Sequence, residues 1–347
     1  MNRPLVVKLG SSLVVDEHGE PRRELLLARA REIGEIVTSG VPVCVVSSGA
    51  IAIGLRRMGL ERRPRSLPRL QAASALGQSA LQRVWEDALG VHGLRAGQVL
   101  LTAAEIADRR AYVNVRNALG ALFSFGAVPV VNENDATATD EITFGDNDAL
   151  AAQAAVLVRA RLLVLLTSVE GVLTHAPGDT RAQVIADGAL ARSAVFGRST
   201  EIGRGGIGSK VAAAEMASAA GIPVVIATGA GDAVLAPILA GEPLGTRFEP
   251  AATGESAFKL WLRFGKRISG RIYVDDGARR AVVGDGRSLL AVGVVRSEGA
   301  FRAGDGVELC GLDGTPFGRG ISSVDAGELE ARPSQVEAVH RDRLVLY

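Results

Sequence analysis

The sequence predicts an α/β protein: a three-layer α/β/α sandwich with a mainly parallel sheet, followed by a small β-rich C-terminal domain. In the longer first part, apolar runs of strand length alternate with segments of helical spacing, which is typical of a parallel sheet covered on both faces. Further on, from about Phe264, helical patterns fade and short strands alternate with the turns Asp276-Gly277, Asp285-Gly286, Asp305-Gly306 and Asp313-Gly314. We therefore expect domains at residues 1–260 and 267–347, with the linker inside residues 249–266.

Length and composition exclude several classes of protein. A chain of 347 residues can form two domains, and its 47% hydrophobic and 22% charged residues are ordinary for a globular protein. The formal charge of +1 gives no general reason to expect nucleic acid or an anionic membrane as a partner. No apolar run is long enough to span a bilayer, no secretory leader is recognisable, and two cysteines cannot form a disulfide framework. We expect a cytoplasmic protein.

The first predicted strand contains an unusual lysine. Residues 5–9 (LVVKL) form an apolar run that ends at Gly10, and Lys8 lies inside it. An isolated ammonium is costly to bury, so Lys8 either contacts an anion or reaches solvent from an edge position. The residues alone favour neither alternative.

The following elements support the parallel sheet. Residues 23–38 have helical spacing, and a pattern of helix, glycine, apolar residue, proline and strand then occurs three times, at Gly40, Gly126 and Gly221. Further strands are predicted at residues 96–101 and 162–166, and two long amphipathic helices, interpreted as structural, at residues 68–89 and 109–125.

Ligands of such sheets bind outside the carboxyl ends of the strands. Those ends carry small, hydroxylated, amide or charged residues here, in the segments 8–11, 47–50, 132–135, 167–168 and 228–229. Ser48 and Gly49 directly precede a helical stretch, whose N-terminus suits a phosphate or carboxylate. The alternative for Ser48 is a plain helix cap.

The stretch from Val130 to Leu150 is strongly acidic. It contains six acids, three asparagines and no lysine or arginine, and it follows a predicted buried strand. Carboxylates that converge at a strand end need cations, which can be a metal, the ammonium group of a ligand, or distant lysines. The alternative is an exposed acidic loop.

A glycine-rich segment at residues 203–210 (GRGGIGSK) precedes a predicted helix. Small residues let backbone N–H groups approach an anion. The segment contains G-x-G-x-x-G but lacks the preceding strand of a dinucleotide fold, and Ser209 separates the Gly and Lys that a Walker A loop has adjacent. It is interpreted as a phosphate clamp that ends in Lys210, with a flexible surface loop as the alternative. Two lysines, anion sites and clustered acids together favour phosphoryl transfer.

Seven segments resemble the amino-acid kinase family, in that family's order and within residues 3–247: VVKLGSSL, VSSGAIAIG, QAASALGQSALQRVWE, GQVLLT, PVVNENDATATDEITFGDNDALAA, LLLTSVEGV and GRGGIGSKVAAAEMA. The C-terminal part resembles a PUA domain. Within the family, the similarity is to the members that phosphorylate L-glutamate. The resemblance implies transfer of the ATP γ-phosphoryl group, with Mg²⁺, to the side-chain carboxylate, which gives L-glutamyl 5-phosphate in the first step of proline biosynthesis.

The resemblance also implies roles for individual residues. The expected catalytic residues are Lys8, Lys210 and Asp148. L-Glutamate is expected to contact Ser48, Gly49, Asn132, Asp135, Asp146 and Asn147. ATP is expected to contact Lys8, Gly10, Thr167, Ser168, Arg204, Gly205, Gly206, Ile207, Gly208, Ser209 and Lys210. No residue is assigned as a metal ligand.

Some properties remain open. The family pattern usually has Asp where this chain has Ser168 and Thr where it has Arg204, so the nucleotide site is expected to be more positive. The resemblance implies a homodimer or homotetramer and feedback inhibition by proline. The alternatives are a kinase of the same fold for another acid, such as aspartate, N-acetylglutamate or carbamate, and an added RNA-binding role of the PUA domain. The latter is disfavoured because residues 265–347 carry twelve basic and twelve acidic residues.

Overall fold

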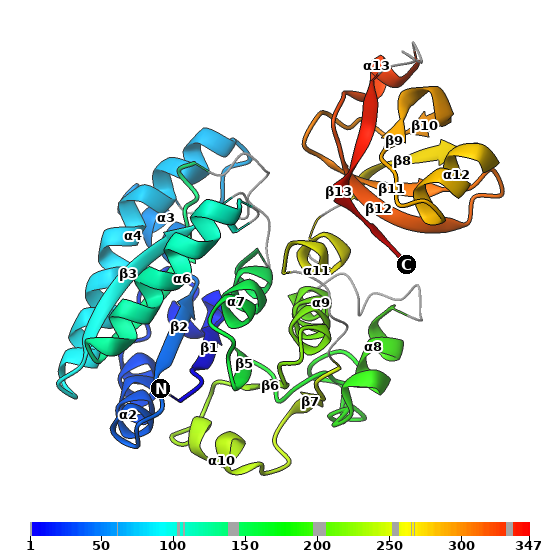
Figure 1. Cartoon of the computed structure of the whole chain (residues 1–347). Coiled ribbons are helices and arrows are strands. Elements are labelled where there is room, and N and C mark those ends of the chain that lie inside the picture. Colours follow the sequence, from blue (N-terminus) through cyan, green and yellow to red (C-terminus); the bar gives the residue numbers. More distant parts are fainter. Residues whose placement is uncertain are drawn as a thin grey trace. The chain divides into compact units, whose positions relative to one another are not determined.

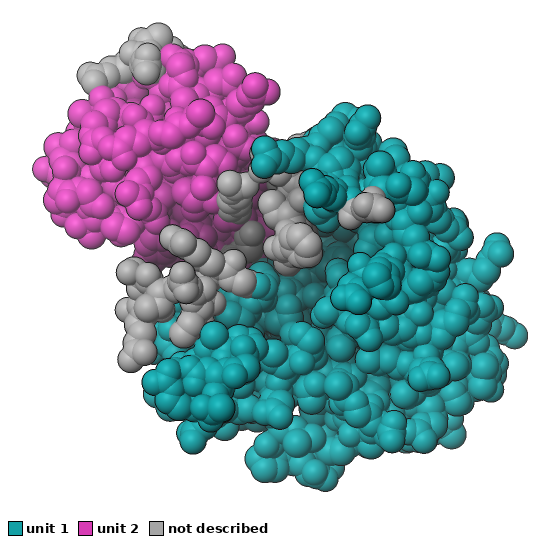
Figure 2. All heavy atoms as spheres, turned by 180° about the vertical axis from the view of Figure 1, so that it is seen from behind, with its two compact units in different colours: residues 1–254 teal, residues 255–347 magenta. Residues whose placement is uncertain are grey.

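The computed structural model describes residues 2–60, 62–102, 105–106, 108–137, 146–196, 206–251, 257–264, 266, 268–330 and 336–347. The chain divides into two units, residues 1–254 and 255–347, which have separate colours in Figure 2. This division falls inside the expected linker range of 249–266. It assigns the first helix after the division to the second unit, whereas the expected first domain extends to residue 260.

The first unit contains a sheet of seven strands (Figure 1). Their order in the sheet is β3-β4-β2-β1-β5-β6-β7, and every pair is parallel except β6 and β7. The strands are β1 (Leu5–Leu9), β2 (Val43–Ser47), β3 (Arg95–Leu101), β4 (Ala127–Glu133), β5 (Leu162–Thr167), β6 (Val224–Thr228) and β7 (Thr246–Phe248).

Helices cover both faces of this sheet, as the sequence predicts. Its helices are α1 (Ser11–Val14), α2 (Arg23–Thr38), α3 (Ala50–Arg57), α4 (Leu67–Gly90), α6 (Arg109–Ser124), α7 (Asp146–Leu157), α8 (Gly188–Phe196), α9 (Gly206–Ala219) and α10 (Leu235–Ala240). One face packs against α2, α4 and α10, while α7 and α9 contact the strands from the other face. Among the described residues, no helix is long and apolar enough to cross a membrane.

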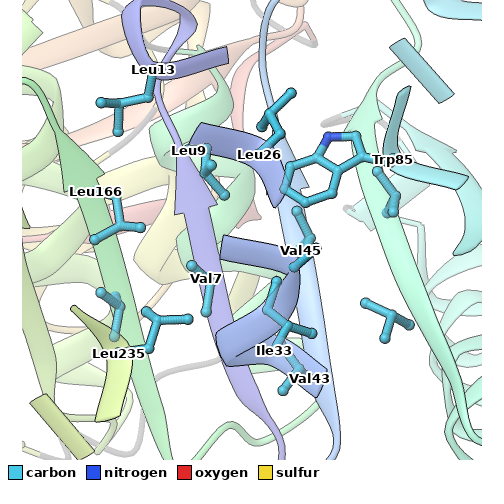
Figure 3. Packing of buried hydrophobic residues seen from close by; sticks show 14 of the residues in the cluster. Val7, Leu9, Leu13, Leu26, Ile33, Val43, Val45, Trp85, Leu166 and Leu235 are labelled. Carbon is cyan, nitrogen blue, oxygen red and sulfur yellow. The ribbon is translucent and has the colours of Figure 1, made fainter. Parts of the chain in front are cut away.

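The central strand β1 shows how the core orients the site. Its alternate residues Leu5, Val7 and Leu9 are fully buried and belong to the core that Figure 3 shows, together with side chains of α2, α4 and α10. Because successive side chains of a strand point to opposite faces, Val6 and Lys8 point toward α7 and α9. Apolar packing on one face thus fixes the direction of Lys8 on the other.

The second unit is built on a six-stranded sheet in the order β10-β8-β11-β12-β13-β9, with β8 and β11 parallel and the other neighbours antiparallel. Its strands are β8 (Ile268–Val274), β9 (Leu289–Leu290), β10 (Val294–Glu298), β11 (Gly306–Cys310), β12 (Pro316–Ser322) and β13 (Glu337–Leu346). Its helices are α11 (Ala257–Phe264), α12 (Asp276–Val283), the 3₁₀ turn η2 (Ala291–Gly293) and α13 (Ala326–Glu330).

One predicted turn of the second unit is wrong. Asp276 and Gly277 are the first residues of α12, because the side chain of Asp275 accepts a hydrogen bond from the backbone N–H of Ala278 and caps the helix. The pair Asp-Gly predicts a turn only where no preceding residue supplies such a cap. The unit has a core of its own, which includes the buried Ile272, Val307 and Leu309.

Candidate active site

A cleft of about 1240 Å³ lies at the carboxyl ends of the parallel strands of the first unit. It is lined by the residues that follow β1, β2 and β4, by the end of β5, and by the first turns of α3, α7 and α9. The polar residues that line it include Lys8, Ser48, Asn132, Asp135, Asn147, Asp148, Thr167, Ser209 and Lys210. The cleft therefore lies where the sequence places the ligand.

Asp148 joins two lysines that are far apart in the sequence. One carboxylate oxygen, Oδ1, accepts a short hydrogen bond from Lys8 Nζ, and the other, Oδ2, lies 3.2 Å from Lys210 Nζ. Ser209 Oγ donates a further hydrogen bond of 2.7 Å to Oδ2. All of Asp148 is buried, and Lys8 and Lys210 are 3% and 9% exposed. The alternative of an edge lysine that snorkels to solvent is thereby excluded for Lys8.

Local structure explains this arrangement. Asp148 is in the first turn of α7, where the positive end of the helix dipole favours a carboxylate. Lys210 is one turn into α9, and its ammonium also donates to the carbonyl of Gly206 at 3.2 Å. The interpretation of this segment as a loop before the helix is wrong for its described part, because α9 already begins at Gly206. The hydrogen bond from Lys210 back to Gly206 stabilises this first turn.

The charges of the cluster depend on one another. Burial alone would raise the pKa of Asp148, but attraction by Lys8 and then by Lys210 outweighs it and lowers that pKa. Burial lowers the pKa of Lys8, while Asp148 opposes this shift and Lys210 adds to it. Contacts with the two lysines thus favour the ionised form of Asp148, which holds both side chains at the wall of the cleft.

A second cluster connects β2, β4 and α7. Asn147 Nδ2 donates to Ser48 Oγ and to Asn132 Oδ1, both at 2.9 Å, and lies 3.3 Å from the carbonyl oxygen of Ser47. Asn132 Nδ2 in turn donates to Gln78 Oε1 at 2.7 Å. Oδ1 of Asn147 is buried and has no hydrogen-bond partner among the described residues. This oxygen is an acceptor that a ligand donor can satisfy.

Asp135 differs from Asp148 in its surroundings. It is 7% exposed, and its Oδ2 accepts a hydrogen bond of 2.5 Å from Ser74 Oγ. Burial raises its pKa, and the hydrogen bond from Ser74 and attraction by Arg63 only partly oppose this shift. The alternative of an exposed acidic loop is thus excluded for Asp135, a buried carboxylate whose nearby charge and hydrogen bond only partly offset its burial.

The sequence interpretation missed the contribution of α4, which it treated as a structural helix. Ser74 and Gln78 of this helix contact Asp135 and Asn132, respectively. A signal was present, because Ser74, Gln78 and Gln82 follow each other at intervals of four residues, and all three are buried. A buried polar row on an amphipathic helix indicates polar partners inside the protein.

Helices α3 and α4 pack backbone against backbone beneath the cleft. A Cβ atom on Gly77 would lie 1.8 Å from the carbonyl oxygen of Ala50, and one on Gly54 would lie 1.7 Å from that of Ala73. Gly49, which begins α3, has a left-handed φ of 108°. These glycines allow the start of α3 and the polar row of α4 to lie close together.

Only some of the remaining predicted site residues line the cleft. Gly10, Gly49 and Gly206 line the cleft, whereas Ser168, Ile207 and Gly208 are not among its lining residues. Arg204 and Gly205 are outside the described residues, as is the side chain of Asp146. The cleft also has lining residues that were not predicted, among them Ser11, Ser12, the segment 16–19 and Arg56.

Comparison with known proteins agrees with this geometry. The model of the amino acid kinase family matches residues 3–228, and that of the PUA domain matches residues 270–340. The chain is 42% identical to the glutamate 5-kinase of Sphingopyxis alaskensis and 37% identical to that of Pelobacter propionicus. Each match covers 99% of this chain and 97% of the relative. The chain belongs to the glutamate 5-kinase branch of the amino acid kinase family. It is therefore a kinase with a C-terminal PUA domain, which confirms the predicted fold class.

The donor groups of this kinase indicate how a metal ion can be held. Among the described residues, no group of three or more His, Cys, Asp or Glu side chains is arranged to hold a metal ion. Both oxygens of Asp148 are engaged by the lysines and Ser209. This carboxylate is therefore already occupied by protein donors.

Proposed function

We propose that this kinase transfers the γ-phosphoryl group of ATP to the side-chain carboxylate of L-glutamate and forms L-glutamyl 5-phosphate, the first step of proline biosynthesis. The observation that carries the proposal is the contact of Lys8 and Lys210 with the same buried carboxylate, Asp148, inside a cleft that also contains Asp135 and Asn147. The names of the relatives agree with it.

The chemistry requires no general base. The attacking carboxylate is already ionised at neutral pH. One of its oxygens forms a bond to the γ-phosphorus while the bond from that phosphorus to the β,γ-bridging oxygen breaks, and ADP keeps the electron pair. The main obstacle is repulsion between two anions. Lys8 and Lys210 offset the charge on the phosphoryl oxygens, and Asp148 keeps the two ammonium groups in place.

The opposite wall of the cleft fits the amino-acid part of the substrate. The carboxylate of Asp135 and the unpaired Oδ1 of Asn147 are acceptors for the α-ammonium group. Ser48 and the backbone N–H groups at the start of α3 are donors for the α-carboxylate. An α-ammonium group would add positive charge beside Asp135, whose pKa is raised by burial.

Mg²⁺ would reach the site on the phosphates of ATP and add positive charge there. Gly10, Thr167 and the first turn of α9 would contact the nucleotide, with Arg204, Gly205, Ser168, Ile207 and Gly208 as further expected contacts. A cytoplasmic location, a dimer or tetramer, and inhibition by proline remain predictions from the family.

A substrate panel tests the proposal. ATP consumption is measured with Mg²⁺ and L-glutamate, L-aspartate, N-acetyl-L-glutamate or carbamate, and the acyl phosphate is trapped with hydroxylamine. We expect turnover with L-glutamate to exceed that with N-acetyl-L-glutamate or carbamate by at least about 10²-fold, because substrates without an α-ammonium group leave buried acceptors unpaired. L-Aspartate keeps the ammonium group but is one methylene shorter, so its rate should be lower by about tenfold or more. Faster turnover of another acid would contradict the substrate assignment.

A further inference from the structure

A second, smaller hollow of the first unit is rich in arginine. It has a volume of about 240 Å³ and lies between the N-terminal end of α2, the last turn of α3 and the middle of α4. Its floor is apolar, formed by Pro21, Ile53, Ala80 and Val84, and its rim carries Arg23, Arg56, Arg57 and Arg83. We call it the arginine pocket.

The charges of this pocket are not balanced. Glu20 pairs with Arg56, and Asp87 lies 3.9 Å from Arg23. Among the described residues, no carboxylate is within ion-pair distance of Arg57 or Arg83. Arg57 uses one N–H group to donate to the carbonyl of Leu76 at 3.0 Å. Two guanidinium groups from two helices are therefore available to one small anion.

The pocket shares a wall with the active-site cleft. Gly19 and Arg56 line both. The shared wall is the hairpin of residues 15–21, in which Asp16 and Glu20 form two hydrogen bonds, one of 2.9 Å between backbone groups and one of 2.8 Å to the side chain of Asp16. The cleft side of this hairpin consists of residues 16–19. An anion that engages Arg56 would compete with Glu20 for it and so act on the wall of the cleft.

We propose that the arginine pocket binds a small anion, a phosphate or a carboxylate, and that its occupancy changes the affinity of the cleft for the amino-acid substrate through the Glu20–Arg56 ion pair. Guanidinium groups match both anions with two parallel hydrogen bonds. The apolar floor adds contact surface for a ligand that carries a short carbon chain, which would favour a carboxylate over inorganic phosphate.

The test separates this pocket from the cleft, which binds phosphates itself. Binding of inorganic phosphate and of succinate to the full-length protein is measured by calorimetry at constant ionic strength, without ATP. The double variant Arg57→Gln/Arg83→Gln should lose affinity for the preferred anion by about tenfold or more. The variant Lys210→Met should keep this binding event, because it alters only the cleft.

A matched control removes the same charge elsewhere. Arg110 and Arg116 are exposed on α6 and line neither hollow. The variant Arg110→Gln/Arg116→Gln should bind the anion as the unchanged protein does. An equal loss in both double variants would show non-specific attraction by net charge and would overturn the proposal.

A kinetic readout tests the coupling to the cleft. The preferred anion should raise the KM for L-glutamate in the unchanged protein and in the α6 control, but not in Arg57→Gln/Arg83→Gln, whose kcat without anion should be normal. Two results would overturn the proposal: an identical anion effect in all three proteins, or a change of molecular mass in solution that shows the arginines to be a subunit contact. Absence of calorimetric binding by an active protein would refute the arginine pocket alone and leave the kinase assignment intact.

Discussion

Asp148 and Asp135 are both buried in the same cleft, yet their pKa values are shifted in opposite directions. Two lysines lower the pKa of Asp148 in spite of its burial, whereas burial raises the pKa of Asp135 more than Ser74 and Arg63 lower it. The first carboxylate already has its cations from the protein. Ser74 of α4 donates a hydrogen bond to the second carboxylate, and this bond and Arg63 only partly offset the effect of its burial. We propose that this difference divides the cleft into a half that presents cations to phosphate and a half that receives a cation from the substrate.

Removal of Asp148 should have the largest effect. Asp148→Asn leaves Lys8 and Lys210 without their buried counter-ion, and the free energy of unfolding should fall by about 3–5 kcal/mol at neutral pH. Because the pKa of Asp148 is lowered in the folded protein, its stabilisation is present above the ordinary value of 3.8 and is lost as the pH falls through the lowered value. Chemical denaturation at several pH values measures this loss. The exposed Asp285→Asn is the control, and a similarly small effect in both variants would contradict the role of Asp148.

Loss of one lysine should reduce the rate more than the stability. Lys210→Met should lower kcat by about 10²–10³-fold, because a charge that stabilises the transition state is removed. Circular dichroism should show the fold retained, and the exposed Lys259→Met should have normal activity. A normal rate in the Lys210 variant would contradict the proposed role of this half of the cleft, which is to present cations to phosphate.

The close packing of α3 and α4 beneath the substrate-binding half of the cleft should not accommodate an added methyl group at Gly77. Gly77→Ala would force α4 away from the carbonyl of Ala50, and thermal or chemical denaturation should show a loss of about 1–3 kcal/mol. Gly120→Ala in α6 provides the contrast, since a Cβ atom there meets no atom within 4 Å. The control should be neutral or slightly stabilising, because alanine favours a helix over glycine by roughly 1 kcal/mol. Equal effects at both positions would contradict close packing as the reason for Gly77.

Ser48→Ala should have the smallest effect, and it should change the KM for L-glutamate without changing the KM for ATP. It removes one hydrogen-bonding hydroxyl, so the KM for L-glutamate should rise by about two- to tenfold, in line with about 0.5–1.5 kcal/mol for one such bond. The KM for ATP should stay the same. A shift of the KM for ATP alone would place Ser48 in the other half of the cleft.

Much of this division could be predicted from the sequence. The apolar run around Lys8 left two alternatives open, an anionic partner or an edge position, and the glycine-rich segment that ends in Lys210 was interpreted as an anion site. The acids after β4 indicated cationic partners, with an exposed loop as the alternative. The family resemblance implied that Asp148 orients the lysines, and the structure shows its contacts with both. The residues alone could not show this, because it depends on which face of β1 and which turn of α7 meet. The roles of Ser74 and Gln78 were missed for a similar reason: helical periodicity identifies a buried face but not its partner. The start of α9 at Gly206 was missed because glycine is a poor helix former, and the contacts of Ser209 and Lys210 with Asp148 of α7 are not visible in the local sequence.

The most direct test of the account concerns the substrate ammonium group. The ratio of kcat/KM for L-glutamate to that for glutarate, which lacks the ammonium group, is measured for the unchanged kinase and for Asp135→Asn. Asparagine keeps an acceptor for Ser74 but removes the negative charge, so the ratio should fall by at least about tenfold. A ratio unchanged by Asp135→Asn, in a folded protein with normal affinity for ATP, would contradict the assignment of Asp135 as the partner of the substrate.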